Sequence, residues 1–220
     1  MRKLGLITIG QTPRVDIMPD IEPVFGPEIE ILQAGALDGL THEDIAKFAP
    51  ENGDYVLISK LKDGTSAVFA EKHILPRLQG CIDKLEEQGA ELIMFLCTGD
   101  FPEFKHNVPI YFPCNILNGT IPSLCKTLAV VTPVTEQIEQ SRQKWEKYVE
   151  NVIVVAASPY GDPEELDKAC DSIAATNADL VLLDCMGFTS EMKARAQKKS
   201  GKFVVLSRTM AARVLSELLQ

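Results

Sequence analysis

Short apolar runs recur along the whole chain, and each is bounded by polar or turn-forming residues. Several runs are apolar at consecutive positions rather than at alternate ones, which is typical of strands buried on both faces of a parallel sheet. Strands are therefore expected over residues 4–9, 29–33, 55–59, 67–70, 92–97, 128–132, 152–157, 180–185 and 203–206.

Between these runs, apolar residues follow a helical spacing. Helices are expected over residues 71–88, 135–149, 163–177, 189–200 and 209–219, with a shorter helical segment within 39–52. The alternation of strands and helices predicts an α/β protein with mainly parallel sheets. Residues 54–70 interrupt this rhythm with two apolar runs around Asp63-Gly64, a turn sequence that predicts a β-hairpin.

Two pairs of segments resemble each other. GAELIMFLCTGDF (89–101) aligns with NADLVLLDCMGFT (177–189), and LITIGQTPRVD (6–16) aligns with LAVVTPVTEQI (128–138). This repeat predicts two similar Rossmann-like halves with a cleft between them. We place the first half at residues 1–115, including a hairpin insertion near 54–70, and the second half at 116–207. A C-terminal helix over 208–220 is expected to pack back on the first half.

The composition and the net charge of the chain indicate which kinds of binding partner are disfavoured. The chain has 220 residues, of which 45% are hydrophobic and 24% charged, as in an ordinary globular protein. Its net charge of −9 disfavours nucleic acid and anionic membrane surfaces as partners. No apolar run reaches the length of a membrane span. The opening MRKLGLITIG lacks the apolar region and cleavage site of a secretory signal, so we expect a cytoplasmic protein with reduced thiols.

Two cysteines hold equivalent places in the repeat. Cys97 and Cys185 end strands in the two halves, and ligands of open α/β sheets bind beyond the carboxyl ends of the strands. Free backbone N–H groups after each strand would bind an anion and lower the pKa of a thiol. The alternative is that both cysteines only fill the core, since cysteine is among the most buried residue types.

The loops at the strand ends supply the other candidates, through hydroxyl groups, backbone N–H groups and glycines that permit close approach. The expected substrate-binding residues are Gln11, Thr12, Thr98, Gly99, Thr132, Pro133, Ser158, Gly187, Phe188 and Thr189. Their alternative role is in turns and helix caps, and Thr189 suits an N-cap in either case. Arg14 offers either a fork for a carboxylate or a solvated surface charge.

Several well-known site patterns are missing from the sequence. There is no P-loop and no GxGxxG after the first strand, which disfavours a nucleotide cofactor. His42, His73 and His106 are far apart and lack the spacing of metal ligands. No GxSxG nucleophile elbow is present. We therefore expect a site without cofactor or metal.

Four segments of the chain together resemble the AroM family, a family without an assigned function: LITIGQTPR, THEDIAKFAPENGDYVLISKLKDG, VVTPVTEQ with Gln143-Lys144-Trp145, and ADLVLLDCMGF. More distantly, the two-half arrangement is similar to the aspartate/glutamate racemase superfamily, which includes hydantoin racemases, maleate isomerases and arylmalonate decarboxylases. That resemblance implies an enzyme that needs no cofactor, pyridoxal phosphate included, and that carries a cysteine at a strand end in each half. Under it, Cys97-Thr98 and Cys185 match the two cysteine loops. Thr132-Pro133 matches the loop near the bound carboxylate.

The resemblance has departures as well. Met186-Gly187 stand where the amino-acid racemases have Thr-His after the second cysteine, and Gln11-Thr12 stand in place of an N-terminal Asp-Ser. We expect a cofactor-independent racemase, isomerase or decarboxylase that acts on a small carboxylic acid through the two cysteines. The alternative is a non-catalytic protein that binds a small carboxylate or metabolite. A homodimer is left open as the assembly.

Overall fold

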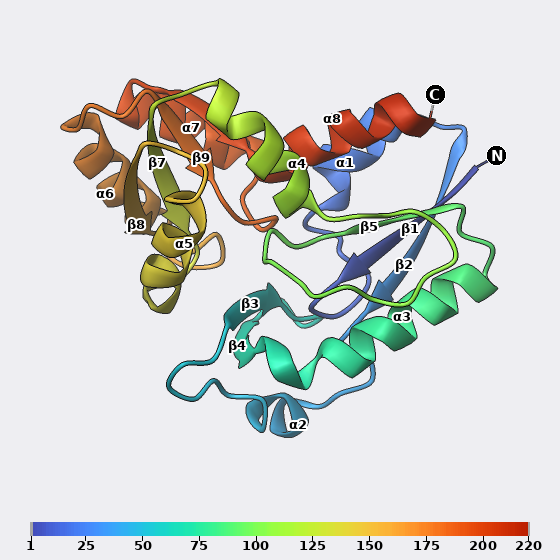
Figure 1. Cartoon of the computed structure of the whole chain (residues 1–220). Helices are drawn as coiled ribbons and strands as arrows, with labels where there is room; N and C mark the ends of the chain where they lie inside the picture. Colours follow the sequence, from blue (N-terminus) through green and yellow to red (C-terminus); the bar gives the residue numbers. More distant parts are fainter. Residues whose placement is uncertain (1, 220) are drawn as a thin grey trace.

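Two separate parallel sheets form the centre of the molecule (Figure 1). The structure is a computed structural model that describes residues 2–219. The first sheet has the order β2-β1-β5-β6 and consists of β1 (Arg2–Thr8), β2 (Ile29–Gly35), β5 (Leu92–Phe95) and β6 (Ile110–Tyr111). The second has the order β10-β9-β7-β8 and consists of β7 (Thr127–Thr132), β8 (Asn151–Ala156), β9 (Leu180–Leu183) and β10 (Phe203–Leu206). This confirms the predicted α/β class with two similar Rossmann-like halves.

Helices cover the sheets, and a hairpin stands apart from both. The α-helices are α1 (Met18–Phe25), α2 (His42–Ala46), α3 (Leu75–Glu87), α4 (Pro113–Thr120), α5 (Ile138–Trp145), α6 (Pro163–Ala174), α7 (Ser190–Ser200) and α8 (Ser207–Leu219). Short 3-10 turns precede or follow some of them: η1 (Glu71–His73), η2 (Ile121–Ser123) and η3 (Thr135–Gln137). The strands β3 (Val56–Lys60) and β4 (Ser66–Ala70) pair antiparallel as the hairpin. No helix between residues 2 and 219 combines the length and apolar character of a transmembrane segment.

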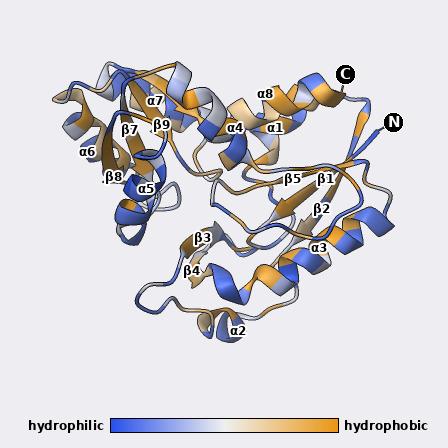
Figure 2. Ribbon diagram, in the orientation of Figure 1, coloured by the Kyte–Doolittle hydropathy of each residue, from blue (hydrophilic) through white to orange (hydrophobic). Residues whose placement is uncertain are grey.

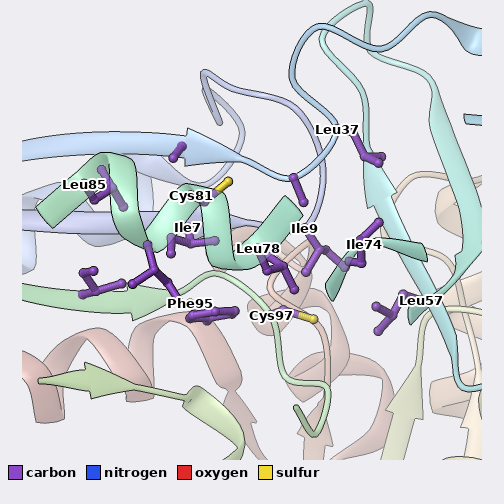
Figure 3. Packing of buried hydrophobic residues seen from close by; sticks show 14 of the residues in the cluster. Ile7, Ile9, Leu37, Leu57, Ile74, Leu78, Cys81, Leu85, Phe95 and Cys97 are labelled. Atoms are coloured by element: carbon purple, nitrogen blue, oxygen red, sulfur yellow. The ribbon is translucent and has the colours of Figure 1, made fainter. Parts of the chain in front are cut away.

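The first sheet is buried on both faces. Ile7, Ile93 and Phe95 point towards α3 and the hairpin, while Leu4 and Leu6 point towards α1 and α8. Figure 3 shows the former cluster, in which Cys97 lies next to Phe95. Figure 2 shows the strands of both sheets as mainly hydrophobic and the outer helices as mixed. This two-sided burial is the physical reason why the strands read as continuous apolar runs.

The second sheet is covered in the same way. Leu183 packs in a cluster with α6 and α7, and Leu182 packs on the opposite face in a cluster that holds Trp145 of α5 and Leu117 of α4. Successive strand residues point to opposite faces. Leu183 of β9 therefore contacts the α6 layer and Leu182 contacts the α5 layer. The loop that follows β9 leaves the sheet between these two helical layers.

The central strands of the two sheets end alike. The residue before Cys97 donates its backbone N–H to the carbonyl of Ile7, and the residue before Cys185 donates to the carbonyl of Val131. The two cysteines are thus structural counterparts. Each lies two residues beyond the end of its strand, at the carboxyl edge of its sheet.

The Thr-Pro segments are not counterparts in this sense. β1 ends at Thr8 and β7 ends at Thr132, so Thr8 is the residue equivalent to Thr132. Thr12 lies four residues further on, and no helix begins at Pro13, because α1 starts only at Met18. Matching Thr12 with Thr132 by their shared Thr-Pro sequence was therefore wrong, since the loop after β1 is longer than the loop after β7.

The C-terminal helix α8 connects the second half of the chain to the first. It packs against α1 and α4, beside the first sheet (Figure 1). The expected first half begins at residue 1 and the expected last helix ends at residue 220, and both of these residues lie outside the described ones. At the N-terminal end of α8 the fully buried Arg208 donates to the carbonyls of Met186 and Asp16 and to the carboxylate of Asp20. One guanidinium therefore binds the loop after β9 to the segment before α1.

The β3–β4 hairpin forms hydrogen bonds with η3 and α5, which belong to the second half of the chain. Gln137 Nε2 donates to the carbonyl of Val56 at 2.7 Å, and Gln140 Oε1 accepts from the N–H of Val56 at 3.0 Å. β3 belongs to the chain segment between β2 and β5, whereas the two glutamines belong to η3 and α5. The hairpin thus bridges the space between the two sheets.

Candidate functional site

A cavity of about 50 Å³ lies where the hairpin and the carboxyl ends of the two sheets meet. One water occupies on the order of 10–15 Å³ of such space, so the cavity holds a few waters or a ligand with few heavy atoms. The side chains in its lining that carry polar or reactive groups are Arg14, Tyr55, Ser59, Cys97, Thr98, Thr132, Gln137, Gln140, Ser141, Lys144, Tyr160, Asp184 and Cys185.

Both cysteine counterparts line this cavity, and each has the same local structure. The backbone N–H of Gly99 points at Cys97 Sγ with an N–S distance of 3.4 Å, and the N–H of Gly187 points at Cys185 Sγ at 3.3 Å. The Cys-x-Gly sequence of each loop thus aims a backbone donor two residues further on at the sulfur. Such a donor stabilises a thiolate.

The thiol pKa values nevertheless move in the direction opposite to the one expected from the sequence. Burial raises the pKa of Cys97 to about 12, against which the N–H of Gly99 has only a partial effect. Burial also raises the pKa of Cys185, and Gly187 and the positive charge of Arg14 partly oppose it. Desolvation of the charged form outweighs the helix and loop N–H groups here, so the expectation of lowered thiol pKa values was wrong.

Arg14 is buried at the edge of the cavity and is not a surface charge. Its Nε and Nη2 atoms bind the two carboxylate oxygens of Asp16, both at 2.8 Å. Nη1 donates to Thr8 Oγ1 at 2.8 Å and to Ser59 Oγ at 3.2 Å, and Nη2 also donates to Tyr160 Oη at 3.4 Å. The guanidinium therefore fixes the end of β1 to the hairpin and to the loop after β8.

Lys144 and Asp184 form a second buried charged pair. Lys144 Nζ donates to the carbonyl of Thr98 at 2.8 Å and lies 3.9 Å from Asp184 Oδ2. Trp145 Nε1 donates to the same carboxylate oxygen at 2.9 Å. Asp184 Oδ1 is buried and has no hydrogen-bond partner within residues 2–219. The ammonium of Lys144 thus lies at the Cys97 loop, and the carboxylate of Asp184, with one unsatisfied oxygen, lies next to Cys185 in the chain.

Two tyrosine hydroxyl groups complete the polar lining. Tyr55 Oη accepts from the N–H of Asp100 at 3.0 Å, and Tyr160 Oη accepts from Arg14. Burial is the main cause that raises the pKa of both hydroxyls. They are therefore neutral at physiological pH and can donate a hydrogen bond.

The family model described as "AroM protein" matches residues 4–219. The chain belongs to the AroM family. No curated protein matches the sequence. In the described part of the chain, residues 2–219, no three His, Cys, Asp or Glu side chains cluster as metal ligands would.

Solved structures share the fold of this AroM-family chain. Allantoin racemase from Klebsiella pneumoniae has a TM-score of 0.67 at 14% identity, with 100% of this chain and 88% of that one covered. Aspartate racemase of Picrophilus torridus has 0.66 at 15%, covering 100% and 94%. An unliganded arylmalonate decarboxylase has 0.62 at 14%, covering 100% and 92%. The racemase-like fold expected from the sequence is thereby confirmed.

Five of the expected binding residues line the cavity together with the two cysteines: Thr98, Gly99, Thr132, Pro133 and Gly187. They come from three loops at the carboxyl edges of the two sheets. Thr132 is buried and donates its hydroxyl proton to Gln137 Oε1 at 3.1 Å, and Thr98 Oγ1 donates to the carbonyl of Asp184 at 3.2 Å. Both hydroxyls therefore also connect the loops around the cavity.

The other five expected binding residues have structural roles away from the cavity. Gln11 donates to the carbonyls of residues 37 and 40, and Thr12 donates its N–H and hydroxyl to Asp38. Ser158 Oγ accepts from the N–H two residues further on. Phe188 is fully buried in the core and Thr189 is the N-cap of α7. The alternative role in turns and helix caps therefore fits Ser158 and Thr189, whereas Gln11 and Thr12 bind the loop after β2 and Phe188 fills the core.

The sequence reasoning missed Tyr55, Lys144 and Tyr160 as residues of the lining. It noted Asp184 only as a neighbour of Cys185 that could orient the thiol, and it left Arg14 between two roles. One signal existed for Lys144: it falls three residues after Ser141 and directly before Trp145, on the buried side of α5. A lysine on the apolar side of a helix needs a partner inside the protein, and that pattern marks it as a site residue.

Proposed function

We propose that the protein is a cofactor-independent racemase, isomerase or decarboxylase that acts on a small carboxylic acid, with Cys97 and Cys185 as its acid–base pair. The observation that carries the proposal is the shared environment of the two sulfurs. They follow equivalent strands, line one small cavity and each accept a backbone N–H. The solved proteins of this fold include racemases and a decarboxylase, which supports the same class of chemistry.

The chemistry is a proton transfer on either side of one carbon. One cysteine, as thiolate, removes the proton α to a carboxylate and becomes a thiol, while the opposing thiol gives its proton to the other face and becomes a thiolate. In a decarboxylation, CO₂ leaves instead and one thiol protonates the carbon. A positive charge partly opposes the effect of burial at each thiol, Arg14 at Cys185 and Lys144 at Cys97, although the pKa of both thiols stays raised.

Hydrogen-bond donors around the cavity would stabilise the enediolate-like charge that develops. The neutral hydroxyl of Tyr160 lies in the lining and already accepts from Arg14, so its own proton is free to be donated. A donor placed in a dry cavity strengthens an interaction with a developing negative charge. Such stabilisation has to replace the metal or cofactor electrophile that other enzymes use.

Deuterium exchange tests this proposal. The protein is incubated in D₂O with a panel of amino acids, dicarboxylates and aryl-substituted malonates, and exchange or CO₂ loss at the α-carbon is followed by NMR. We expect turnover of at least one compound that falls at least 100-fold in Cys97→Ala and Cys185→Ala. Cys125→Ala is the control, because that thiol lies outside the cavity. Equal turnover in all three variants would reject the two-thiol mechanism.

A second candidate is a protein that binds a small carboxylate without converting it. The raised thiol pKa values favour it, since few thiolates exist at neutral pH, as does Met186-Gly187 in place of Thr-His. It predicts that a compound of the panel binds by calorimetry with no exchange. It also predicts that Cys97→Ser keeps the affinity of the wild type.

A further inference from the structure

Two cationic side chains line the cavity, but only one of them has donors to spare. Arg14 has five N–H groups, and acceptors on Asp16, Thr8, Ser59 and Tyr160 take all five. Its positive charge is balanced by the paired carboxylate at 2.8 Å. Arg14 therefore cannot bind a carboxylate without breaking a bond that holds the site together.

Lys144 differs in both respects. An ammonium group has three N–H donors, and within residues 2–219 one of them is used, on the carbonyl of Thr98 at 2.8 Å. Asp184 Oδ2 lies 3.9 Å away, beyond hydrogen-bond distance. The face of Trp145, 5.3 Å from Nζ, offers a cation–π contact but no acceptor of a classical hydrogen bond. Two donors of a buried ammonium are thus left for the cavity.

The ammonium keeps its charge in this place. Burial alone would lower the pKa of Lys144, but the negative charges of Asp184 and Asp100 outweigh it, and the pKa is raised. The hydrogen bond from Nζ to the carbonyl of Thr98, the residue after Cys97, holds the ammonium at the Cys97 loop. An anion bound to Nζ in the cavity would therefore lie at the loop that carries Cys97.

We propose that Lys144 binds the carboxylate group of the ligand and thereby restricts the cavity to anions. The inference rests on the proposed function only in taking this cavity as the ligand site. A charged donor with two free hydrogens binds a carboxylate more strongly than a neutral one does. A neutral isostere such as an amide gains no charge–charge attraction to the ammonium, so it binds less well. Lys144 is thus a specificity-determining residue, which places the carboxylate at the Cys97 side of the cavity.

Two alkylating reagents of nearly equal size test this directly. Iodoacetate carries a carboxylate and iodoacetamide does not, and both transfer their carbon to a thiolate with loss of iodide. We expect the ratio of the two rates at Cys97, divided by the same ratio for N-acetylcysteine, to exceed 10 in the wild type. In Lys144→Met it should fall at least tenfold. Peptide mass spectrometry assigns the alkylated thiol.

The control and a rescue separate binding from folding. Lys147→Met removes an exposed lysine three residues away, so it changes the net charge equally and should leave the ratio unchanged. Lys144→Met leaves Asp184 without its neighbouring cation, so Lys144→Met/Asp184→Asn is made as well and should show the same low ratio. A wild-type ratio in either Lys144 variant overturns the proposal, as does an equal loss in Lys147→Met.

A second measurement does not depend on thiol reactivity. Malonate, but not malonamide, should raise the Tm of the wild type, and Lys144→Met should abolish the difference. Equal effects of the two compounds on the wild type would overturn the proposal. Neither test requires turnover, so a protein that discriminates anions but exchanges no deuterium would retain the role of Lys144 and lose the proposed function.

Discussion

Gly187 supports the cavity by leaving room for Tyr160, and replacing it by alanine should be destabilising. A Cβ atom there would clash with Tyr160 Oη and would lie 2.6 Å from Tyr160 Cζ and 2.7 Å from Pro159 Cγ. Gly187 is not among the glycines with positive φ, so the backbone itself accepts alanine and only space decides. The Tyr160 hydroxyl would have to move by about 1 Å to reach ordinary contact, away from its hydrogen bond with Arg14.

Overpacking of this kind costs roughly 1–3 kcal/mol. In a protein of this size that corresponds to a Tm lower by about 2–4 °C per kcal/mol. The matched control is Gly80→Ala, at an exposed position inside α3 where a Cβ meets nothing within 4 Å. There alanine should stabilise by about 0.5–1 kcal/mol, because glycine loses more backbone entropy in a helix.

Urea denaturation with a common slope measures both variants. The free energy of unfolding should fall in Gly187→Ala and rise in Gly80→Ala. Gly187→Ala should also lower the rate of α-carbon exchange, because it displaces Tyr160. If Gly187→Ala is as stable as the wild type, or if both variants shift in the same direction, the close approach of Tyr160 to this loop is not what selects glycine.

Three further outcomes follow from named contacts. Alkylation of Cys97 by iodoacetamide should rise about tenfold per pH unit from pH 7 to 10 without a plateau, because the reactive form is the thiolate and the pKa is about 12; a plateau below pH 9 in site-resolved mass spectrometry contradicts this. Trp145→Phe removes the 2.9 Å bond to buried Asp184 and should cost about 1–3 kcal/mol in urea denaturation, and a cost below about 0.5 kcal/mol would show that the acceptor finds another donor. Gln137→Ala should speed hydrogen exchange in the hairpin, whereas Gln143→Ala, at an exposed position, should not; unchanged exchange in both would mean that the glutamine does not dock the hairpin.

The strands were predictable because burial on two faces leaves a local trace in the sequence. The run at 203–206 coincides with β10, and 128–132 differs from β7 by one residue. β6 has only two residues, too few to show any pattern. α1 was missed because it contains Pro23, which normally marks the end of a helix. Its formation depends on packing against α8, which no local pattern records.

The candidate site was predictable only as far as it depends on strand ends. Cys97 and Cys185 stand at fixed offsets from two recognisable strands, so position alone indicated them. Thr12 was predicted to match Thr132 because both precede a proline, although β1 ends at Thr8 and not at Thr12. Tyr55 and Lys144 reach the cavity from a hairpin and from a helix far along the chain. Their presence there follows from long-range packing, and sequence spacing carries no information about it.

The position of α8 has a consequence for how the chain folds as it is made. α8 covers the face of the first sheet that also packs on α1, and Leu215 lies in one cluster with Leu6 and Ile21. Synthesis proceeds from the N-terminus, and segments fold as they emerge from the ribosome. The second sheet is thus complete while the first still lacks its cover. A nascent chain that has reached β10 presents an apolar layer that only α1 and its flanking segments cover in part, so the half that is translated first is the half that is finished last.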